Sequence, residues 1–179
     1  MKIRLSSDIT FDSIVDGPGL RMVIWTQGCI HGCIGCHNAQ THNLYGGYEI
    51  DIDIIINYIK TLKLQRGITL LGGEPFLQQE PLQRIARQAK KCNLDVWAYT
   101  GYTFEELIDK DNPSYLKNLK LLNEIDVLVD GKFIESKKDI SLRFRGSSNQ
   151  RIIDVPKSLE YKTVFLNEEY MDEALCSVR

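Results

Sequence analysis

The chain has 179 residues, of which 43% are hydrophobic and 26% are charged, with 22 lysines and arginines against 24 aspartates and glutamates. This length suits one folded unit, so we expect residues 1–179 to form a single domain. The formal net charge of −2 excludes a broad basic surface for nucleic acid, and no segment approaches the roughly 20 consecutive apolar residues that span a membrane.

The first residues, MKIRLSSDIT (1–10), contain no continuous apolar stretch and no small-residue cleavage site. This composition predicts a cytoplasmic protein. The five cysteines are odd in number and unevenly placed, which is not typical of a disulfide framework. In a reducing compartment, cysteines that lie close together are first interpreted as metal ligands.

Five short apolar runs predict buried strands, because each is brief and flanked by turn or charged residues. They cover 20–27, 67–72, 94–100, 126–131 and 151–155. Segments with apolar residues at helical spacing lie between them and predict helices. These cover 51–63, 79–91, 104–110 and 114–123. The weakly patterned tail, 156–179, predicts a last strand at 161–167 and a short helix.

Local signals support the starts of three helices. Asp51 is a suitable N-cap for the first, and Pro81 lies in the first turn of the second, where its missing N–H does no harm. Thr103 and Glu106 have the spacing of a capping box at the start of the third.

Strands that alternate with helices predict a parallel sheet built from right-handed crossovers, so the expected fold class is α/β. About five or six such units would form an open, partial (β/α) barrel rather than a closed one. Four unusual sequences follow consecutive predicted strands: the cysteine-rich loop, GGEP, TGY and DGK. Ligands of such folds gather at the carboxyl ends of the strands, so we expect these four loops to meet on one rim.

Three of the cysteines lie within GCIHGCIGCHNAQ (28–40), with the spacing C-x3-C-x2-C. They are Cys29, Cys33 and Cys36, and a glycine precedes each of them. Glycines let a short loop wrap around a compact object and direct several side chains inward. Thiolates select zinc or iron–sulfur clusters over hard cations.

Two kinds of metal site fit these residues. A structural zinc site needs four ligands, so it would recruit His31, His37 or His42, or a distant cysteine. A cubane iron–sulfur cluster held by three thiolates needs no fourth protein ligand and leaves one iron with an open position. The histidines then have no part in binding the metal.

The cysteine spacing after the first predicted strand resembles the signature of the radical S-adenosylmethionine enzymes. DGPG (16–19) resembles the opening of the activases of glycyl radical enzymes, and LLGGEPFLQ resembles their GGE motif. Three later segments resemble the activating proteins of anaerobic ribonucleoside-triphosphate reductases. They are WAYTGYTFEEL (97–107), VLVDGKFIES (127–136) and LRFRGSSNQRIIDV (142–155), and the likeness extends in order, without a large gap, from about Phe11 to Val155.

The resemblance implies a radical S-adenosylmethionine fold with one 4Fe-4S cluster and S-adenosyl-L-methionine as cofactor. In that superfamily the open iron binds the cofactor, and the reduced cluster cleaves it to a 5′-deoxyadenosyl radical. The radical would abstract hydrogen from a glycine of the reductase's large catalytic subunit and leave a glycyl radical there. An external donor such as a flavodoxin would supply the electron, and a homodimer is left open. The alternatives are an activase of another glycyl radical enzyme, such as pyruvate formate-lyase, and a zinc-stabilised binding module without catalysis.

The resemblance also implies roles for individual residues. The cluster ligands would be Cys29, Cys33 and Cys36. The cofactor would be bordered by Gly35, Cys36 and His37, and its amino-acid end would be bound by Gly72, Gly73 and Glu74. Asp130 and Lys132 form the pattern D-x-K, which in related activases lies near the cofactor's carboxylate. From the residues alone, this pair also fits a turn at a strand end and a solvated lysine.

The segment 143–150, with Arg143 and Arg145, is rich in hydrogen-bond donors. It would either contact the cofactor or the partner, or form a polar surface loop. His31 and His42 are expected at the loop surface. Two residues depart from the family pattern: Gly35 stands where an aromatic residue often stacks near adenine, and Ala98 provides no ligand for a cation.

Overall fold

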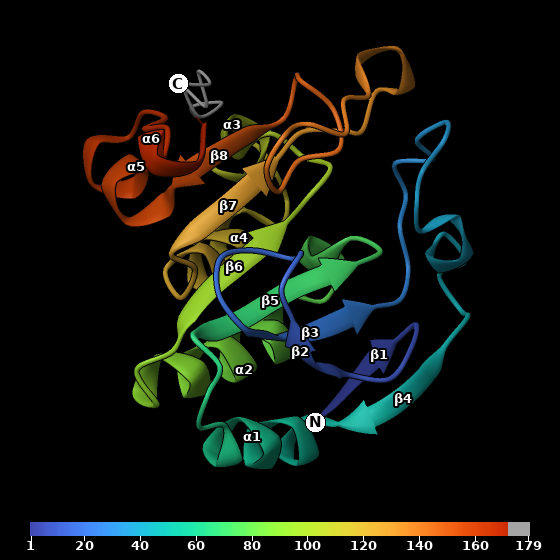
Figure 1. Ribbon diagram of the computed structural model, residues 1–179, viewed down its shortest axis with the longest axis vertical. Helices are drawn as coiled ribbons and strands as arrows, with labels where there is room; N and C mark the ends of the chain where they lie inside the picture. The colour runs from blue at the N-terminus through green and yellow to red at the C-terminus, as the bar shows by residue number, and fades with distance from the viewer. Residues whose placement is uncertain (172–179) are drawn as a thin grey trace, which may run out of the picture.

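The computed structural model of the protein describes residues 1–171 (Figure 1). Its strands form one sheet in the order β4-β1-β3-β5-β6-β7-β8, with β2 paired to β3. The strands are β1 (Lys2–Leu5), β2 (Thr10–Ser13), β3 (Arg21–Thr26), β4 (Tyr48–Asp51), β5 (Gly67–Gly72), β6 (Asp95–Tyr99), β7 (Val127–Asp130) and β8 (Arg151–Asp154). The chain is therefore a mixed α/β protein with a large central sheet.

The helices connect the strands much as predicted. They are α1 (Ile52–Thr61), α2 (Gln79–Lys91), α3 (Phe104–Leu107), α4 (Tyr115–Leu122), α5 (Val155–Tyr161) and α6 (Glu168–Met171), with 3-10 turns η1 (Ala39–Thr41), η2 (Pro75–Leu77) and η3 (Glu135–Lys137). Within residues 1–171, no helix has the length and apolar character needed to cross a membrane.

Four neighbouring strands, β3, β5, β6 and β7, run parallel, as predicted. Helix α1 lies in the connection from β3 to β5, α2 connects β5 to β6, and α3 and α4 connect β6 to β7. Figure 1 shows the arrowheads of β3, β5 and β7 pointing toward the same side of the molecule. The loops that follow these strands therefore begin at one edge of the sheet.

Antiparallel strands extend this parallel group on both sides. β1, β2 and β4 are additions that the sequence analysis does not predict, because each has only four residues and no continuous apolar run. β8 is expected to continue the parallel sheet, and this is wrong, because β8 pairs antiparallel with β7. The connection between them contains only the turn η3 and no crossover helix, which a parallel return would need. An open partial barrel of five or six units is not confirmed.

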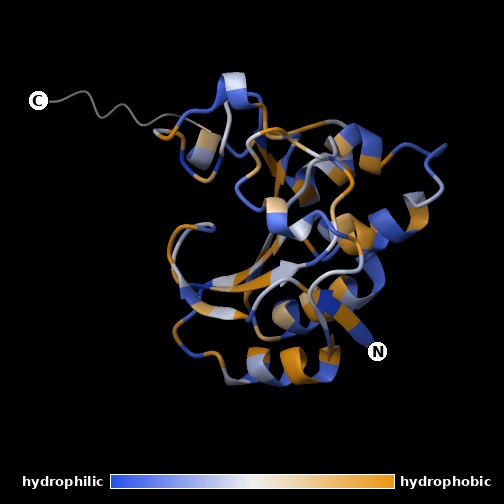
Figure 2. Cartoon of the chain, turned by 90° about the vertical axis from the view of Figure 1, so that its right-hand side faces the viewer, coloured by the Kyte–Doolittle hydropathy of each residue, from blue (hydrophilic) through white to orange (hydrophobic). Residues whose placement is uncertain are grey.

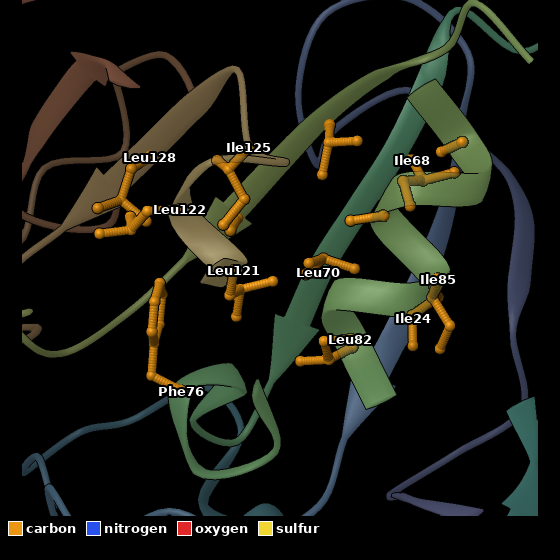
Figure 3. Packing of buried hydrophobic residues seen from close by; sticks show 14 of the residues in the cluster. Ile24, Ile68, Leu70, Phe76, Leu82, Ile85, Leu121, Leu122, Ile125 and Leu128 are labelled. Carbon is orange, nitrogen blue, oxygen red and sulfur yellow. The ribbon is translucent and has the colours of Figure 1, made fainter. Parts of the chain in front are cut away.

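Helix α2 covers one face of the sheet with its apolar stripe. Leu82 and Ile85 are fully buried and belong to the same cluster as Ile24 of β3 and Ile68 and Leu70 of β5 (Figure 3). The predicted spacing of apolar residues in 79–91 thus becomes the buried side of α2. Figure 2 shows the hydrophobic bands along the strands and helices that form this core.

The other face of the sheet carries a smaller aromatic cluster. Successive residues of β6 and β7 alternate between the two faces, so Trp97 and Val129 lie on this side and Leu128 lies on the side of α2. Tyr170 of α6 packs edge to face on Trp97, with ring centroids 5.3 Å apart. The C-terminal part of the described chain is therefore anchored on the face opposite α2.

The tail differs from its prediction. The segment 161–167 does not form a strand; it contains the end of α5, and Lys162 in the left-handed conformation (φ 54°) follows. Its pairing with the sheet is limited to one isolated bridge, between Ile153 and Leu166. The predicted short helix corresponds in part to α6, and the rest of that prediction falls on residues 172–179, outside the described part.

The predicted helix caps are present. Asp51 accepts a hydrogen bond from the backbone N–H of Asp53 at 3.0 Å. Thr103 Oγ1 accepts from Glu106 N at 3.2 Å, and Glu106 Oε2 accepts from Thr103 N at 2.7 Å, which completes the capping box.

Thr103→Ala is expected to lower the free energy of unfolding by about 1 kcal/mol, because it removes one half of this capping box. Urea denaturation followed by circular dichroism measures the change. Thr61→Ala is the matched control: the hydroxyl of Thr61 donates only to the carbonyl of Tyr58 in the last turn of α1. Equal losses in the two variants would contradict a capping role for Thr103.

Candidate active site

A cavity of about 480 Å³ lies at the carboxyl ends of the four parallel strands. Each of the loops after β3, β5, β6 and β7 contributes to its wall. The contributing residues include Cys29, His31, Cys33, Cys36 and His37 after β3, Gly73 after β5, Thr100 and Gly101 after β6, and Gly131 and Phe133 after β7. The expectation that four unusual loops meet on one rim is confirmed.

The three clustered cysteines all face this cavity. Each is half-buried and a free thiol. The glycines before them, Gly28, Gly32 and Gly35, have φ values of 96°, 59° and 71°, a region that other residues rarely adopt. The loop can therefore turn sharply before each cysteine and direct all three thiols inward.

Local contacts set the surroundings of the thiols. The backbone N–H of Asn38 donates to Cys36 Sγ at 3.4 Å, a bond typical of sulfur ligands of iron–sulfur clusters. Burial raises the pKa of the Cys29 thiol. The base of the loop is closed by a backbone bond from Gly28 N to Thr41 O at 2.9 Å.

These donors suit a cluster better than a single ion. In residues 1–171, no group of three or more histidine, cysteine, aspartate and glutamate side chains is arranged to hold one metal ion. A structural zinc ion needs four donors, each within about 2.0–2.3 Å of one point. A cubane cluster instead binds each thiolate at a different iron, so the sulfur atoms can surround a larger object. Three thiols on one cavity wall therefore fit a 4Fe-4S cluster.

The GGE segment packs directly on the start of the cysteine loop. Glu74 N donates to Gly28 O at 2.7 Å, and Gly73 N donates to Thr26 O at 2.8 Å. A Cβ atom at Gly73 would lie 2.3 Å from Gly28 O, closer than real Cβ atoms approach backbone. Glycine at 73 is thus needed for the two loops to touch.

The Glu74 carboxylate lies beneath the cavity rather than in its wall. Its side chain is 0% exposed and accepts from Phe76 N, Gly101 N and Thr100 Oγ1 at 2.9 to 3.0 Å. His31 Nε2 is 2.7 Å from Glu74 Oε2, and because a carboxylate accepts hydrogen bonds, His31 is the donor. Glu74 therefore joins its own loop to the loops after β3 and β6.

The expectation that His31 lies at the loop surface is wrong, whereas His42 is partly exposed. The His31 side chain is only 6% exposed, and its ring packs edge to face on Tyr102 at 4.6 Å. A Cβ atom at Gly101 would lie 2.3 Å from the His31 ring, so the fit is close. His42 is half-buried, and its Nε2 is buried without a hydrogen-bond partner among the described residues. His37 is exposed at the cavity wall, as expected.

The D-G-P-G segment (16–19) is held against the parallel strands. Thr69 Oγ1 donates to the carbonyl of Asp16 at 2.7 Å, and Arg21 Nη1 donates to the carbonyl of Pro18 at 3.1 Å. The Arg21 side chain is fully buried, which fixes this turn firmly. Asp16 lies in the cavity wall as a result.

Asp130 and Lys132 are not brought to this cavity. Asp130 is 1% exposed, accepts from Phe104 N at 2.8 Å and from Arg151 Nε at 3.0 Å, and thereby caps α3. The ion pairs with Asp130 and Glu105 raise the pKa of Arg151. Lys132 is exposed and neither residue belongs to the cavity wall. This geometry agrees with the other interpretation of the pattern D-x-K, in which Asp130 lies in a turn at a strand end and Lys132 is a solvated lysine.

The donor-rich segment divides into two parts. Arg145, Gly146 and Gln150 line the cavity, whereas Arg143 is exposed outside it. Arg143 lies over the ring of Phe144, 5.5 Å from its centroid. Only part of 143–150 is thus in reach of a ligand.

Comparison with known proteins agrees with this arrangement. Residues 15–153 match the family model of a 4Fe-4S single cluster domain. The chain is 40% identical over 147 residues to the anaerobic ribonucleoside-triphosphate reductase-activating protein of Vibrio cholerae, which covers 78% of this chain and 90% of that protein. The chain belongs to the family of anaerobic ribonucleoside-triphosphate reductase-activating proteins. The proteins of the same name from Escherichia coli and Haemophilus influenzae are each 39% identical, over 145 and 148 residues, covering 76% and 78% of this chain and 90% of each relative.

The residues that match the 4Fe-4S domain of this activating-protein family can be compared with the residues that form the site. The region matched by the 4Fe-4S single cluster domain begins at Val15, next to the D-G-P-G turn, and ends at Ile153 in β8. It therefore includes all four loops around the cavity. The resemblance to the activating proteins of anaerobic ribonucleoside-triphosphate reductases is confirmed.

The cavity wall has an aromatic part that no sequence pattern predicted, and it includes Trp25, Tyr99 and Phe133. The ring of Phe133 is 5.4 Å from that of His37, and a Cβ atom at Gly35 would lie 3.3 Å from it. An aromatic ring from the loop after β7 thus stands beside the glycine noted as a departure from the family pattern. Its position two residues beyond the end of a predicted strand (126–131) is the signal that identifies it.

Proposed function

We propose that this chain activates an anaerobic ribonucleoside-triphosphate reductase by generating a glycyl radical on the reductase's large catalytic subunit. The observation that carries the proposal is the convergence of Cys29, Cys33 and Cys36 on one cavity, in a chain of the activating-protein family. A reduced 4Fe-4S cluster bound there would supply the electron for cleavage of S-adenosylmethionine, and through it the chemistry for removing hydrogen from a glycine.

The residues of the chain hold and shield the reacting groups. In this proposal the three thiolates bind the cluster, and Gly35 and His37 border the cofactor. Gly72 and Gly73 let the backbone approach the cofactor's amino-acid end, next to the cysteine loop. The buried Glu74 carboxylate fixes the relative positions of the loops that surround it. The cavity walls limit the access of water to the radical.

Two further residues lie outside the cavity. Asp130 orients α3 and Arg151, and Lys132 remains in solvent. An external one-electron donor such as a flavodoxin completes the proposed reaction. A homodimer and a cytoplasmic location stay predictions.

Metal analysis and electron paramagnetic resonance test this proposal. After anaerobic purification and reconstitution, we expect about four iron atoms and about four sulfides per chain. Mixing the reduced protein with S-adenosylmethionine and the large subunit of the reductase should then produce a glycyl radical signal and one equivalent of 5′-deoxyadenosine. Pyruvate formate-lyase in place of the reductase is the matched control and should give no signal.

Each contrary result would indicate a different function for the chain. Zinc in a one-to-one ratio with the chain, without iron or sulfide, would identify a zinc-stabilised module and end the enzymatic proposal. A radical on pyruvate formate-lyase but not on the reductase would transfer the activity to the other glycyl radical enzyme.

A further inference from the structure

The charged groups of the cavity wall are few. Among the described residues that line it, Arg145 is the only lysine or arginine and Asp16 the only aspartate or glutamate. No ion pair joins these two side chains within the described chain. The cavity therefore presents one cation and one anion that do not neutralise each other directly. That arrangement suits a ligand with an ammonium group and a carboxylate group.

The guanidinium of Arg145 is incompletely used. Its Nη1 and Nη2 donate to the carbonyls of Gln150 and Met171 over long distances, 3.3 and 3.5 Å. Its Nε is buried and has no partner in residues 1–171. A guanidinium has five N–H donors, and its Nε with one Nη forms the fork that binds a carboxylate with two parallel bonds. Arg145 therefore lines the cavity and carries one N–H donor that no group within residues 1–171 uses.

The backbone around Arg145 is arranged to hold it there. Phe144 has φ 56°, a left-handed conformation that is costly for a bulky residue and that reverses the direction of the chain just before Arg145. The Phe144 ring is fixed against Trp97, with centroids 5.4 Å apart. On the other side, Gln150 Oε1 accepts from Gly146 N at 2.8 Å, and Gln150 Nε2 donates to Gly131 O at 3.0 Å. Strained backbone braced from both sides is typical of a functional position.

The other basic residues of this region are in different situations. Lys132 and Arg143 are exposed and do not line the cavity. Arg151 is committed to ion pairs with Asp130 and Glu105. The expected carboxylate contact of Lys132 would thus require the side chain to leave solvent, whereas Arg145 is already in place.

We propose that Arg145 binds the methionyl carboxylate of S-adenosylmethionine. This inference rests on the proposed function of the chain. The guanidinium donates to the carboxylate through Nε and one Nη, and Gln150 holds the loop in the orientation that this requires. Arg145 then sets the affinity for the amino-acid end of the cofactor. The contact selects cofactors that carry the carboxylate over analogues without it.

The test compares two ligands on the cluster-loaded protein, by equilibrium dialysis and by the ligand-induced change in the electron paramagnetic resonance spectrum of the reduced cluster. One ligand is S-adenosylmethionine, and the other is its decarboxylated form, which keeps the adenosyl, sulfonium and amino groups. Arg145→Met is expected to weaken binding of S-adenosylmethionine by about 10- to 100-fold, the range of a hydrogen-bonded charge contact. Binding of the decarboxylated form should stay close to its original value. Arg145→Lys, which keeps the charge without the fork, should fall between the wild type and Arg145→Met.

Arg143→Met and Lys132→Met are the matched controls, and both should bind the two ligands as the original chain does. Equal weakening of both ligands by Arg145→Met would assign Arg145 a structural role and overturn the proposal. A selective loss with Lys132→Met, and none with Arg145→Met, would move the carboxylate contact to Lys132 and also overturn it. If the unchanged, cluster-loaded chain bound neither ligand, the proposed function itself would fall, and this inference with it.

Discussion

Serine at position 29, 33 or 36 is expected to leave the chain without its iron–sulfur cluster. In Cys29→Ser, Cys33→Ser or Cys36→Ser a soft thiolate is replaced by a hydroxyl, which is a hard ligand and keeps its proton at neutral pH. The proposed cluster has three protein ligands, so no spare ligand replaces one that is lost. Iron and sulfide should fall from about four per chain to near zero, and cleavage of S-adenosylmethionine should be lost.

The same variants should remain folded, because the three side chains are only half-buried and lie in a loop outside the core clusters. Circular dichroism of the variants without iron checks this point. Cys92→Ser is the matched control. Cys92 is the C-cap of α2 and does not line the cavity, and its Sγ accepts from the Gln88 side chain at 3.3 Å. A full iron content in any of the three variants, or loss of iron in Cys92→Ser, would contradict the ligand assignment.

The sequence predicted the position of this site better than its internal contacts. Apolar runs identified β3, β5, β6, β7 and β8, and the rule that ligands bind at the carboxyl ends of parallel strands then placed the four loops together. β1, β2 and β4 were missed, because each has four residues and no continuous apolar run, which is too little for a strand pattern to be recognised. The direction of β8 was also missed, since strand patterns do not encode whether a neighbour is parallel.

Side-chain contacts between distant positions were beyond the sequence patterns. His31 and Glu74 are 43 residues apart, and neither neighbourhood indicates that the two side chains meet. The cysteine spacing even favoured the interpretation of His31 as a surface residue or a spare ligand. Likewise, the inward position of Arg145 depends on the left-handed backbone of Phe144, a residue type that gives no warning of positive φ. Such features follow from tertiary packing, which only the folded chain contains.

Glu74→Gln is expected to produce the largest loss of stability among changes of a single functional group near the cavity. The carboxylate accepts from two backbone N–H groups, one at each oxygen. An amide has one acceptor oxygen, so in either orientation its NH₂ group faces the N–H of Phe76 or of Gly101. One buried donor is left without an acceptor and a charged hydrogen bond is lost, which together lower the free energy of unfolding by about 3 kcal/mol. Urea denaturation of the cluster-free chain measures this directly.

Glu80→Gln provides the matched control, because Glu80 undergoes the same carboxylate-to-amide change while exposed on α2. Its pairing with Arg84 at 3.7 Å is a surface salt bridge, so the free energy of unfolding should change by less than about 0.5 kcal/mol.

The size of the Glu74 effect distinguishes two roles for the GGE motif. If Glu74 only contacted the cofactor, its amide variant would weaken cofactor binding and leave the cluster-free chain as stable as before. If Glu74 instead holds three loops together, as its five short contacts indicate, the free energy of unfolding of Glu74→Gln falls even without cofactor. The hydrogen bond from His31 that fixes the cysteine loop is then weakened as well. The thiols of Glu74→Gln should then react faster with a thiol reagent than those of Glu80→Gln. Unchanged stability and thiol reactivity would show that the cysteine loop keeps its place without this clamp.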